Sequence, residues 1–107
     1  MEDLCDKFRR VSRARYTPLS QLVIGEKYHV AHADRTFSSA GPNVIFYLSG
    51  ECAGIDQYWI IILPRNYAWI LSDADLYRIN SGPKMYFLTY RGWSELEKQV
   101  ILELTSL

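Results

Sequence analysis

Two large aromatic side chains lie in or beside expected loops, each close to an arginine. Phe37 follows Arg35, and Trp93 follows Arg91, at points where strands are expected to end. A large apolar ring has less reason to occupy a loop than a core. Aromatic faces can stack on unpaired nucleobases for about 1–3 kcal/mol each, while cations follow the phosphates. This combination favours a surface that binds single-stranded nucleic acid.

Tyr47 and Arg65 are further candidates for such a surface. Tyr47 alternates with the core positions of an expected strand at residues 43–48 and would face outward. Structural interpretations stay open beside the functional one. The two loop rings could fold back as lids over the ends of the domain, and Tyr47 could pack across strands against Trp59 or Tyr90. The arginines could form ordinary surface ion pairs, which contribute little.

Residues 1–15 form a basic lead-in in which five cations fall within nine residues, with no acid between them. These cations are Lys7, Arg9, Arg10, Arg13 and Arg15. Leu4, Phe8 and Val11 recur at helical spacing, which favours a short helix. Arg9, Arg10 and Arg13 could form an arm that contacts phosphates. Alternatively, the cations belong to a solvated helix surface near its C-terminus, where positive charge is favourable.

Nothing in the sequence indicates catalysis, a cofactor or a bound metal. His29, His32 and Asp34 lie within six residues of one another. On an extended strand, however, residues three apart face opposite sides, so we expect the two histidines not to converge. There is no recognisable zinc spacing, glycine-rich phosphate loop or nucleophile elbow. We therefore expect a protein that is not an enzyme.

The composition describes one small domain with balanced charge. The chain has 107 residues, and twelve Lys and Arg offset twelve Asp and Glu. A net charge of zero argues against a protein that coats duplex DNA by bulk charge. Cys5 and Cys52 have no metal-ligand spacing and are expected to be free thiols. With no secretory leader and no long apolar run, we expect an intracellular protein without membrane contact, nuclear rather than cytoplasmic.

A strand followed by a short helix forms the centre of the chain. Residues 58–63 are uncharged and rich in β-branched and aromatic types, which predicts a buried strand. Ser72 and Asp75 have the spacing of a capping box at the start of a helix. That helix is expected to stop at Asn80 and Gly82. In the connection between strand and helix, we expect Tyr67, Trp69 and Ile70 to anchor in the core.

The order of the expected elements is three strands, one helix and two strands. The strands are expected at residues 28–36, 43–48, 58–63, 85–90 and 100–105, with loops at 37–43 and 49–57. This order predicts an all-β domain at residues 16–107, a five-stranded Greek-key barrel of the OB type whose helix plugs one end. A ferredoxin-like domain would need a second helix, and a sandwich would need about seven strands.

Several sequence stretches support a resemblance to a known family. PLSQLVIGEKYHV, RTFSSAGPNVIFYL, IILPRNY, LSDADLYRIN and YFLTYRGW occur in this order. Together they resemble small OB-fold single-stranded DNA-binding proteins, similar to domains of replication protein A, as found in insects, insect viruses and mobile elements. The resemblance covers about residues 16–105. It implies a ligand that crosses the second and third strands, held by loops at 35–42 and 91–99.

The resemblance implies a role in replication, repair or strand protection, with single-stranded DNA rather than RNA as the partner. An alternative is a protein-interaction module on the same barrel, an adaptor or a protein of virus–host contacts. Neutral charge and eight tyrosines favour this alternative, because Tyr and Trp are frequent interface anchors. A homo-oligomer or a protein partner could accompany either function.

Overall fold

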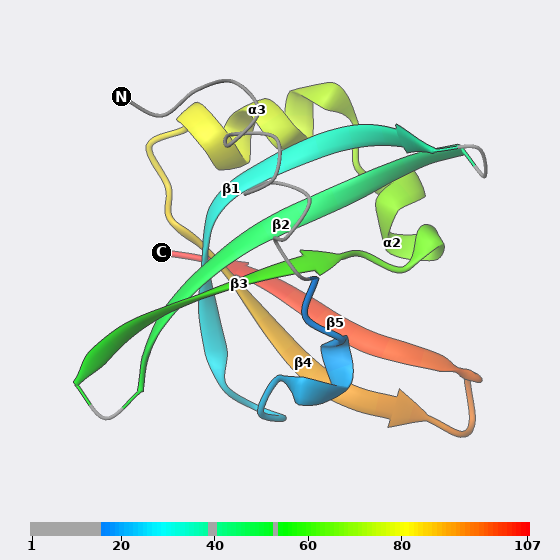
Figure 1. The fold of residues 1–107 in the computed structure, drawn as a ribbon. Coiled ribbons are helices and arrows are strands. Elements are labelled where there is room, and N and C mark those ends of the chain that lie inside the picture. Colours follow the sequence, from blue (N-terminus) through cyan, green and yellow to red (C-terminus); the bar gives the residue numbers. More distant parts are fainter. Residues whose placement is uncertain (1–15, 39–40, 53) are drawn as a thin grey trace, which may run out of the picture.

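The computed structural model describes residues 16–38, 41–52 and 54–107, whose main feature is one strongly curved antiparallel sheet (Figure 1). Its five strands lie in the order β3-β2-β1-β4-β5. The elements are a 3-10 turn η1 (Leu19–Gln21), β1 (Lys27–Ser38), β2 (Gly41–Cys52), β3 (Ile55–Ile62), α2 (Arg65–Ile70), α3 (Asp73–Ser81), β4 (Tyr86–Ser94) and β5 (Gln99–Ser106). The expected all-β class is confirmed, as are five strands of which three precede and two follow the helical segment. The expected N-terminal helix lies outside the described residues.

The first two hairpins are longer than the sequence predicts. Residues 37–43 and 49–57 were expected as loops, but most of them continue the strands. Phe37 pairs with Pro42 at the end of β1 and β2, and Glu51 pairs with Asp56 between β2 and β3. The prediction was wrong because small and polar residues were taken as loop signals. In a long two-stranded ribbon, backbone pairing continues without support from apolar side chains.

A β-bulge at Ala31 divides β1 into two halves. The register shifts between Val30, which pairs with Leu48, and His32, which pairs with Tyr47. Before the bulge, Tyr28 and Val30 face the core. After it, the inward side chain is Ala33, which is 1% exposed. One extra residue thus changes which alternate positions of β1 face the core.

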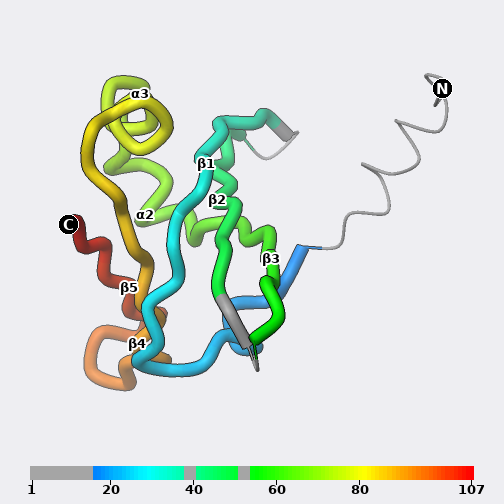
Figure 2. Tube along the Cα trace, turned by 90° about the vertical axis from the view of Figure 1, so that its left-hand side faces the viewer, coloured from blue at the N-terminus to red at the C-terminus, as the bar shows by residue number. Residues whose placement is uncertain are grey.

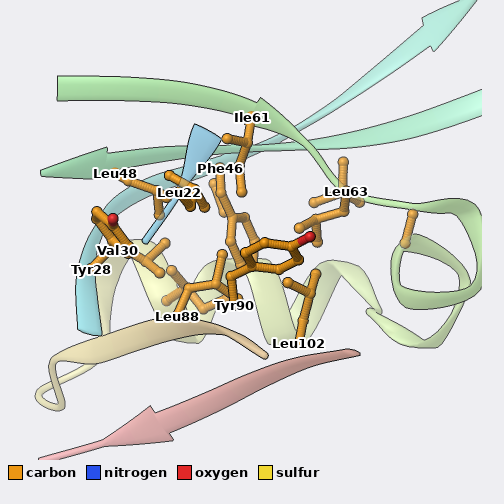
Figure 3. Packing of buried hydrophobic residues seen from close by; sticks show 14 of the residues in the cluster. Leu22, Tyr28, Val30, Phe46, Leu48, Ile61, Leu63, Leu88, Tyr90 and Leu102 are labelled. Atoms are coloured by element: carbon orange, nitrogen blue, oxygen red, sulfur yellow. The ribbon is translucent and has the colours of Figure 1, made fainter. Parts of the chain in front are cut away.

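The core lies on the concave face of the sheet, between the strands and the two helices (Figure 3). Its centre is formed by Val44, Phe46, Leu48 and Ile61, each at most 2% exposed. The expected inward positions of β2 are therefore confirmed. The core is completed by Leu22, Tyr28, Val30, Ala33, Leu63, Ala68, Leu76, Ile79, Leu88, Tyr90 and Leu102.

Two helices, rather than the one expected, connect β3 to β4 within the described residues. α3 begins with the predicted capping box: Asp75 N–H donates to Ser72 Oγ, and Ser72 N–H donates to Asp75 Oδ2. α2 begins directly after Pro64, a residue that is favourable at the start of a helix. The expected core anchoring of Trp69 and Ile70 was wrong, since they are 76% and 73% exposed. A helix this short turns only one narrow stripe toward the sheet.

The sheet is not closed into the expected barrel. β3 and β5 are its two outer strands, and they lie on opposite sides of β1 and β2 in Figure 2. A closing strand would form hydrogen bonds with the outer edges of β3 and β5. A few of these bonds are formed instead by the backbone of Thr17 and by the side chain of Tyr67. Thr17 N–H donates to Ile60 C=O on β3 at 2.7 Å. Tyr67, from α2, binds the outer edge of β5 through its hydroxyl.

Candidate nucleic-acid interface

Three separate segments lie along one side of the domain, on the right in Figure 1, with α2 between the other two. These are the end of the β1–β2 hairpin, helix α2 and the end of the β4–β5 hairpin. The start of α2 is tied to β2 because Leu63 N–H donates to Val44 C=O at 2.9 Å. It is tied to β5 because Asn66 Nδ2 donates to Gln99 Oε1 at 2.8 Å. We call this side of the domain the hairpin-end flank; its hairpin ends carry Phe37 and Trp93, and α2 carries Arg65 and Trp69.

The hairpin-end flank presents three large aromatic rings to solvent. Phe37 is 79% exposed, Trp69 is 76% exposed and Trp93 is 56% exposed. Phe37 and Trp93 do not fold back over the ends of the domain, because rings in that position would be buried. The faces of these rings are therefore open to contacts with a ligand. The sequence interpretation missed Trp69 because its neighbours Tyr67 and Ala68 pack toward the core.

A bulge in β4 determines which residues of β5 lie next to Arg91 and Trp93. The register shifts between Tyr90 and Gly92, and Gly92 has a φ of 89°, in the left-handed region that glycine adopts most easily. Trp93 then pairs with Val100, which packs against the core. Arg91 instead binds Glu103, with Nη2 and Oε2 3.1 Å apart. The ion pair is about half exposed, so it competes only weakly with a phosphate.

Arg35 does not lie on this flank. It follows Ala33 on the inner face of β1 and reaches the connection between the helices. Its Nη2 donates to Leu71 C=O at 2.8 Å, and its Nε donates to Asp73 Oδ1 at 3.0 Å. The guanidinium therefore has a structural role that joins β1 to α2 and α3. Arg65 is exposed at the first position of α2, within the flank.

Tyr47 lies apart from the flank, on the convex face of the sheet. It is next to His32, with ring centroids 5.7 Å apart, and it pairs with Ile60 rather than with Trp59 or Tyr90. Partial burial, and then the charge of Asp34 and the neighbouring Tyr16, raise the pKa of Tyr47. The phenol therefore stays neutral at physiological pH. Of the predicted site residues, Phe37, Arg65 and Trp93 belong to the segments along the flank, whereas Arg35 binds the connection between the helices and Arg91 binds Glu103.

The two histidines share a face, contrary to the sequence expectation. His29 pairs with Ser49 and His32 with Tyr47, two residues apart on β2, because the bulge at Ala31 restores the same orientation. They have separate partners: His29 Nδ1 lies 3.1 Å from Ser49 Oγ, and His32 Nε2 lies 3.1 Å from Asp34 Oδ1. Among the described residues, no group of three or more His, Cys, Asp and Glu side chains could hold a metal ion.

The predicted cations Arg9, Arg10 and Arg13 lie outside the described residues. Within the described part of the chain, no helix has the length and apolar character that a membrane crossing requires. Comparison of the chain with known protein families, with curated protein sequences and with solved structures gives no match. The functional interpretation therefore depends on the residues themselves.

Proposed function

We propose that this chain is a non-catalytic domain of the OB type that binds single-stranded nucleic acid, DNA rather than RNA. Two features of the architecture support the proposal. The strand order places β1 between β2 and β4, and the helices lie between β3 and β4, as in a five-stranded Greek-key barrel. Tyr67 and Thr17 occupy part of the edges that a complete barrel would pair.

The observation that carries the proposal is the exposure of Phe37, Trp69 and Trp93 on one flank. Successive bases of a single strand could stack on such rings, and stacking tolerates any base because each has a π-face. Arg65 lies four residues before Trp69 and so on the same face of α2, where it could contact a phosphate next to a stacked base. The flank joins two hairpin ends and a helix start, so one strand of nucleic acid could cross all three.

The balanced charge limits how tightly one copy can bind. On the β4–β5 hairpin, Lys98 Nζ lies 3.1 Å from Glu95 Oε2, so this cation is already paired. We therefore expect weak binding by an isolated domain, with a shallow salt dependence set by few phosphate contacts. A second domain, an oligomer or a protein partner would raise the affinity through effective concentration. This fits a role in replication, repair or protection of displaced strands.

Fluorescence anisotropy with a labelled oligo-dT, at two salt concentrations, tests the proposal. We expect saturable binding at low salt that weakens as salt rises. Trp69→Ala combined with Trp93→Ala should weaken it about tenfold or more, because each lost stack removes about 1–3 kcal/mol. Tyr58→Ala is the matched control, since Tyr58 is 75% exposed but lies on the convex face, on β3. No binding at low salt, or equal losses in all variants, would contradict the proposal.

A protein-interaction module is a second candidate function, favoured by the same exposed rings and by the paired cations. Interfaces are rich in Trp, Tyr and Phe and poor in charged residues at their centre. In this case Phe37→Ala with Trp93→Ala would weaken a protein contact and leave binding of oligo-dT unchanged. A mass that rises with protein concentration in light scattering, and falls in the double variant, would favour this candidate.

A further inference from the structure

Along β5, residues whose backbone groups bond to β4 alternate with residues whose backbone groups face the outer edge of the sheet. In an antiparallel pair, every second residue directs its N–H and C=O away from the partner strand. Leu102 N–H donates outward to Tyr67 Oη at 2.8 Å, and Leu107 N–H donates inward to Met85 C=O at 3.0 Å. This alternation places the backbone groups of Leu104 and Ser106 on the outer edge.

Tyr67 occupies only the first part of this edge. Its hydroxyl donates to Val100 C=O at 3.1 Å and accepts from Leu102 N–H. Beyond it, the C=O of Leu102, both backbone groups of Leu104 and the N–H of Ser106 have no partner among the residues that the structure describes. Four groups in a row with strand geometry can pair with one more extended chain.

An apolar cavity opens directly beside this edge. It has a volume of about 180 Å³ and lies between α2 and the inner face of β5. Its walls include Phe46, Leu63, Ile70, Leu88 and Leu104, and at the mouth Ile70 and Leu104 are 73% and 42% exposed. A cavity of about 150 Å³ with similar walls is large enough to hold a benzene ring. This one therefore has room for a side chain the size of leucine or phenylalanine.

A second cavity, of about 320 Å³, lies at the next row of the sheet. Its walls include Arg78, Lys84 and Tyr86. This cavity borders β4 rather than β5, but Tyr86 pairs with Ser106, two residues along from the pair of Leu88 with Leu104, so the long side chains of Arg78 and Lys84 lie toward that row of the sheet. Arg78 forms only a long ion pair with Asp75, in which Nη1 and Oδ1 are 3.9 Å apart. The positive charge here would favour a carboxylate.

We propose that the outer edge of β5 is a docking site for an extended peptide of a partner protein, which adds to the sheet as a sixth strand. The peptide carries a large apolar residue that fills the cavity beside Leu104. Two positions away, it carries an acidic residue that faces Arg78 and Lys84. Backbone pairing supplies general affinity, and the two cavities select the sequence. This site is separate from the hairpin-end flank and does not depend on nucleic-acid binding.

Two short synthetic peptides test the proposal on the full chain. Each is a capped heptapeptide of threonines with leucine at its centre; one has glutamate two positions after the leucine, the other two positions before it, because the strand could run in either direction. Titration is followed by amide NMR. We expect one of the peptides to shift the amide signals of Leu104 and Ser106 and to slow their hydrogen exchange. Replacement of its leucine by alanine should weaken binding about tenfold, since most of the buried apolar area is lost.

Two protein variants separate edge pairing from cavity filling. Ser106→Pro removes the outward N–H without breaking a bond to β4, a position where an edge strand accepts proline. Ile70→Asn makes the cavity mouth polar. Both should weaken peptide binding about tenfold or more, while Trp69→Asn, an equally exposed neighbour on α2, should leave it unchanged. Trp69→Asn should instead weaken binding of oligo-dT, so the two proposals can fail independently.

Specific results would overturn the inference. No shift at Leu104 and Ser106 with either peptide at millimolar concentration would do so. Equal binding of the leucine and alanine peptides, or unchanged binding in Ser106→Pro and Ile70→Asn, would also do so. If these amides were protected without peptide and the mass doubled with protein concentration, the occupant would be a second copy of the chain. That outcome would replace the peptide proposal.

Discussion

Two of the edges that the sheet leaves without a neighbouring strand, the second half of β1 and the outer side of β5, are completed in different ways. Beyond His29, β1 has no pairing with β4, but α3 covers this edge. Asn80 Oδ1 accepts from Ala33 N–H at 2.7 Å, and Asn80 Nδ2 donates to Ala33 C=O at 2.8 Å. On β5, Tyr67 contributes a single hydroxyl, and the edge beyond Leu102 stays open.

This difference shows that one side chain can replace a strand only over one residue. The amide of Asn80 has a donor and an acceptor in the same geometry as a peptide group, so it satisfies both backbone groups of Ala33. The hydroxyl of Tyr67 also satisfies one donor and one acceptor, and the difference between the edges is that α3 packs along β1, whereas the backbone groups of β5 beyond Leu102 have no partner among the described residues. The covered edge therefore belongs to the folded core, and the open edge is available to another chain.

Asn80→Ala is expected to have the largest effect on the covered edge. It leaves the N–H and C=O of Ala33 without a partner, and a buried unsatisfied group costs about 1–3 kcal/mol, so the free energy of unfolding should fall by about 2 kcal/mol or more. Urea denaturation measures the change. Asn66→Ala is the control, because its bond to Gln99 is exposed and should be worth less than about 0.5 kcal/mol. Equal effects of the two variants would remove the contrast between the edges.

Tyr67→Phe should have an intermediate effect and lengthen the open edge. The ring still packs against the core, but Val100 C=O and Leu102 N–H lose their partner. We expect a loss of about 1–2 kcal/mol in the free energy of unfolding, since the bonds are only partly buried. Hydrogen exchange at Leu102 should become faster. If its exchange stayed slow, another group would be protecting this edge, and β5 would resemble β1.

The capping box of α3 should give the smallest effect, seen as a dependence of stability on pH. Hydrogen bonds from Ser72 lower the pKa of Asp75 below its ordinary value. A carboxylate with a lowered pKa stabilises the folded state above the unfolded-state pKa, near pH 4, and this contribution is lost as pH falls through the lower folded-state value. Melting temperatures measured from neutral to acidic pH should therefore fall less in Asp75→Asn than in the unaltered protein. If the melting temperatures of the two proteins fell in parallel, the carboxylate of Asp75 would not stabilise α3, the helix that covers the edge of β1.

Local signals in the sequence were sufficient for several of these features. Ser72 and Asp75 are three residues apart and their bonds form within one turn, so the capping box could be predicted. The alternation of Val44, Phe46 and Leu48 predicted the inner face of β2. The order of the strands followed from the same kind of pattern.

Contacts between distant residues could not be predicted in this way. Arg35 was expected on a ligand surface, but its partners Leu71 and Asp73 are more than thirty residues away. The bond between Asn80 and Ala33 is of the same type, although Asn80 was expected only to stop a helix. The exposure of Trp69 depends on how α2 is rotated, which its neighbours in space decide. The sequence therefore could indicate Phe37 and Trp93 at the ends of strands, but it could not give the partners of Arg35 or the exposure of Trp69.

The extra residue at Ala31 has a consequence for how β1 tolerates change in length. Deletion of this one position would leave Val30 opposite Leu48 and His32 opposite Tyr47, so Ala33 would still face the core and only the local bend and twist of the bulge would be lost. A substitution at Ala31 would keep the phase, and its side chain is exposed. This position should therefore accept many residue types, and a deletion here should change the curvature of the sheet rather than the set of side chains that face the core.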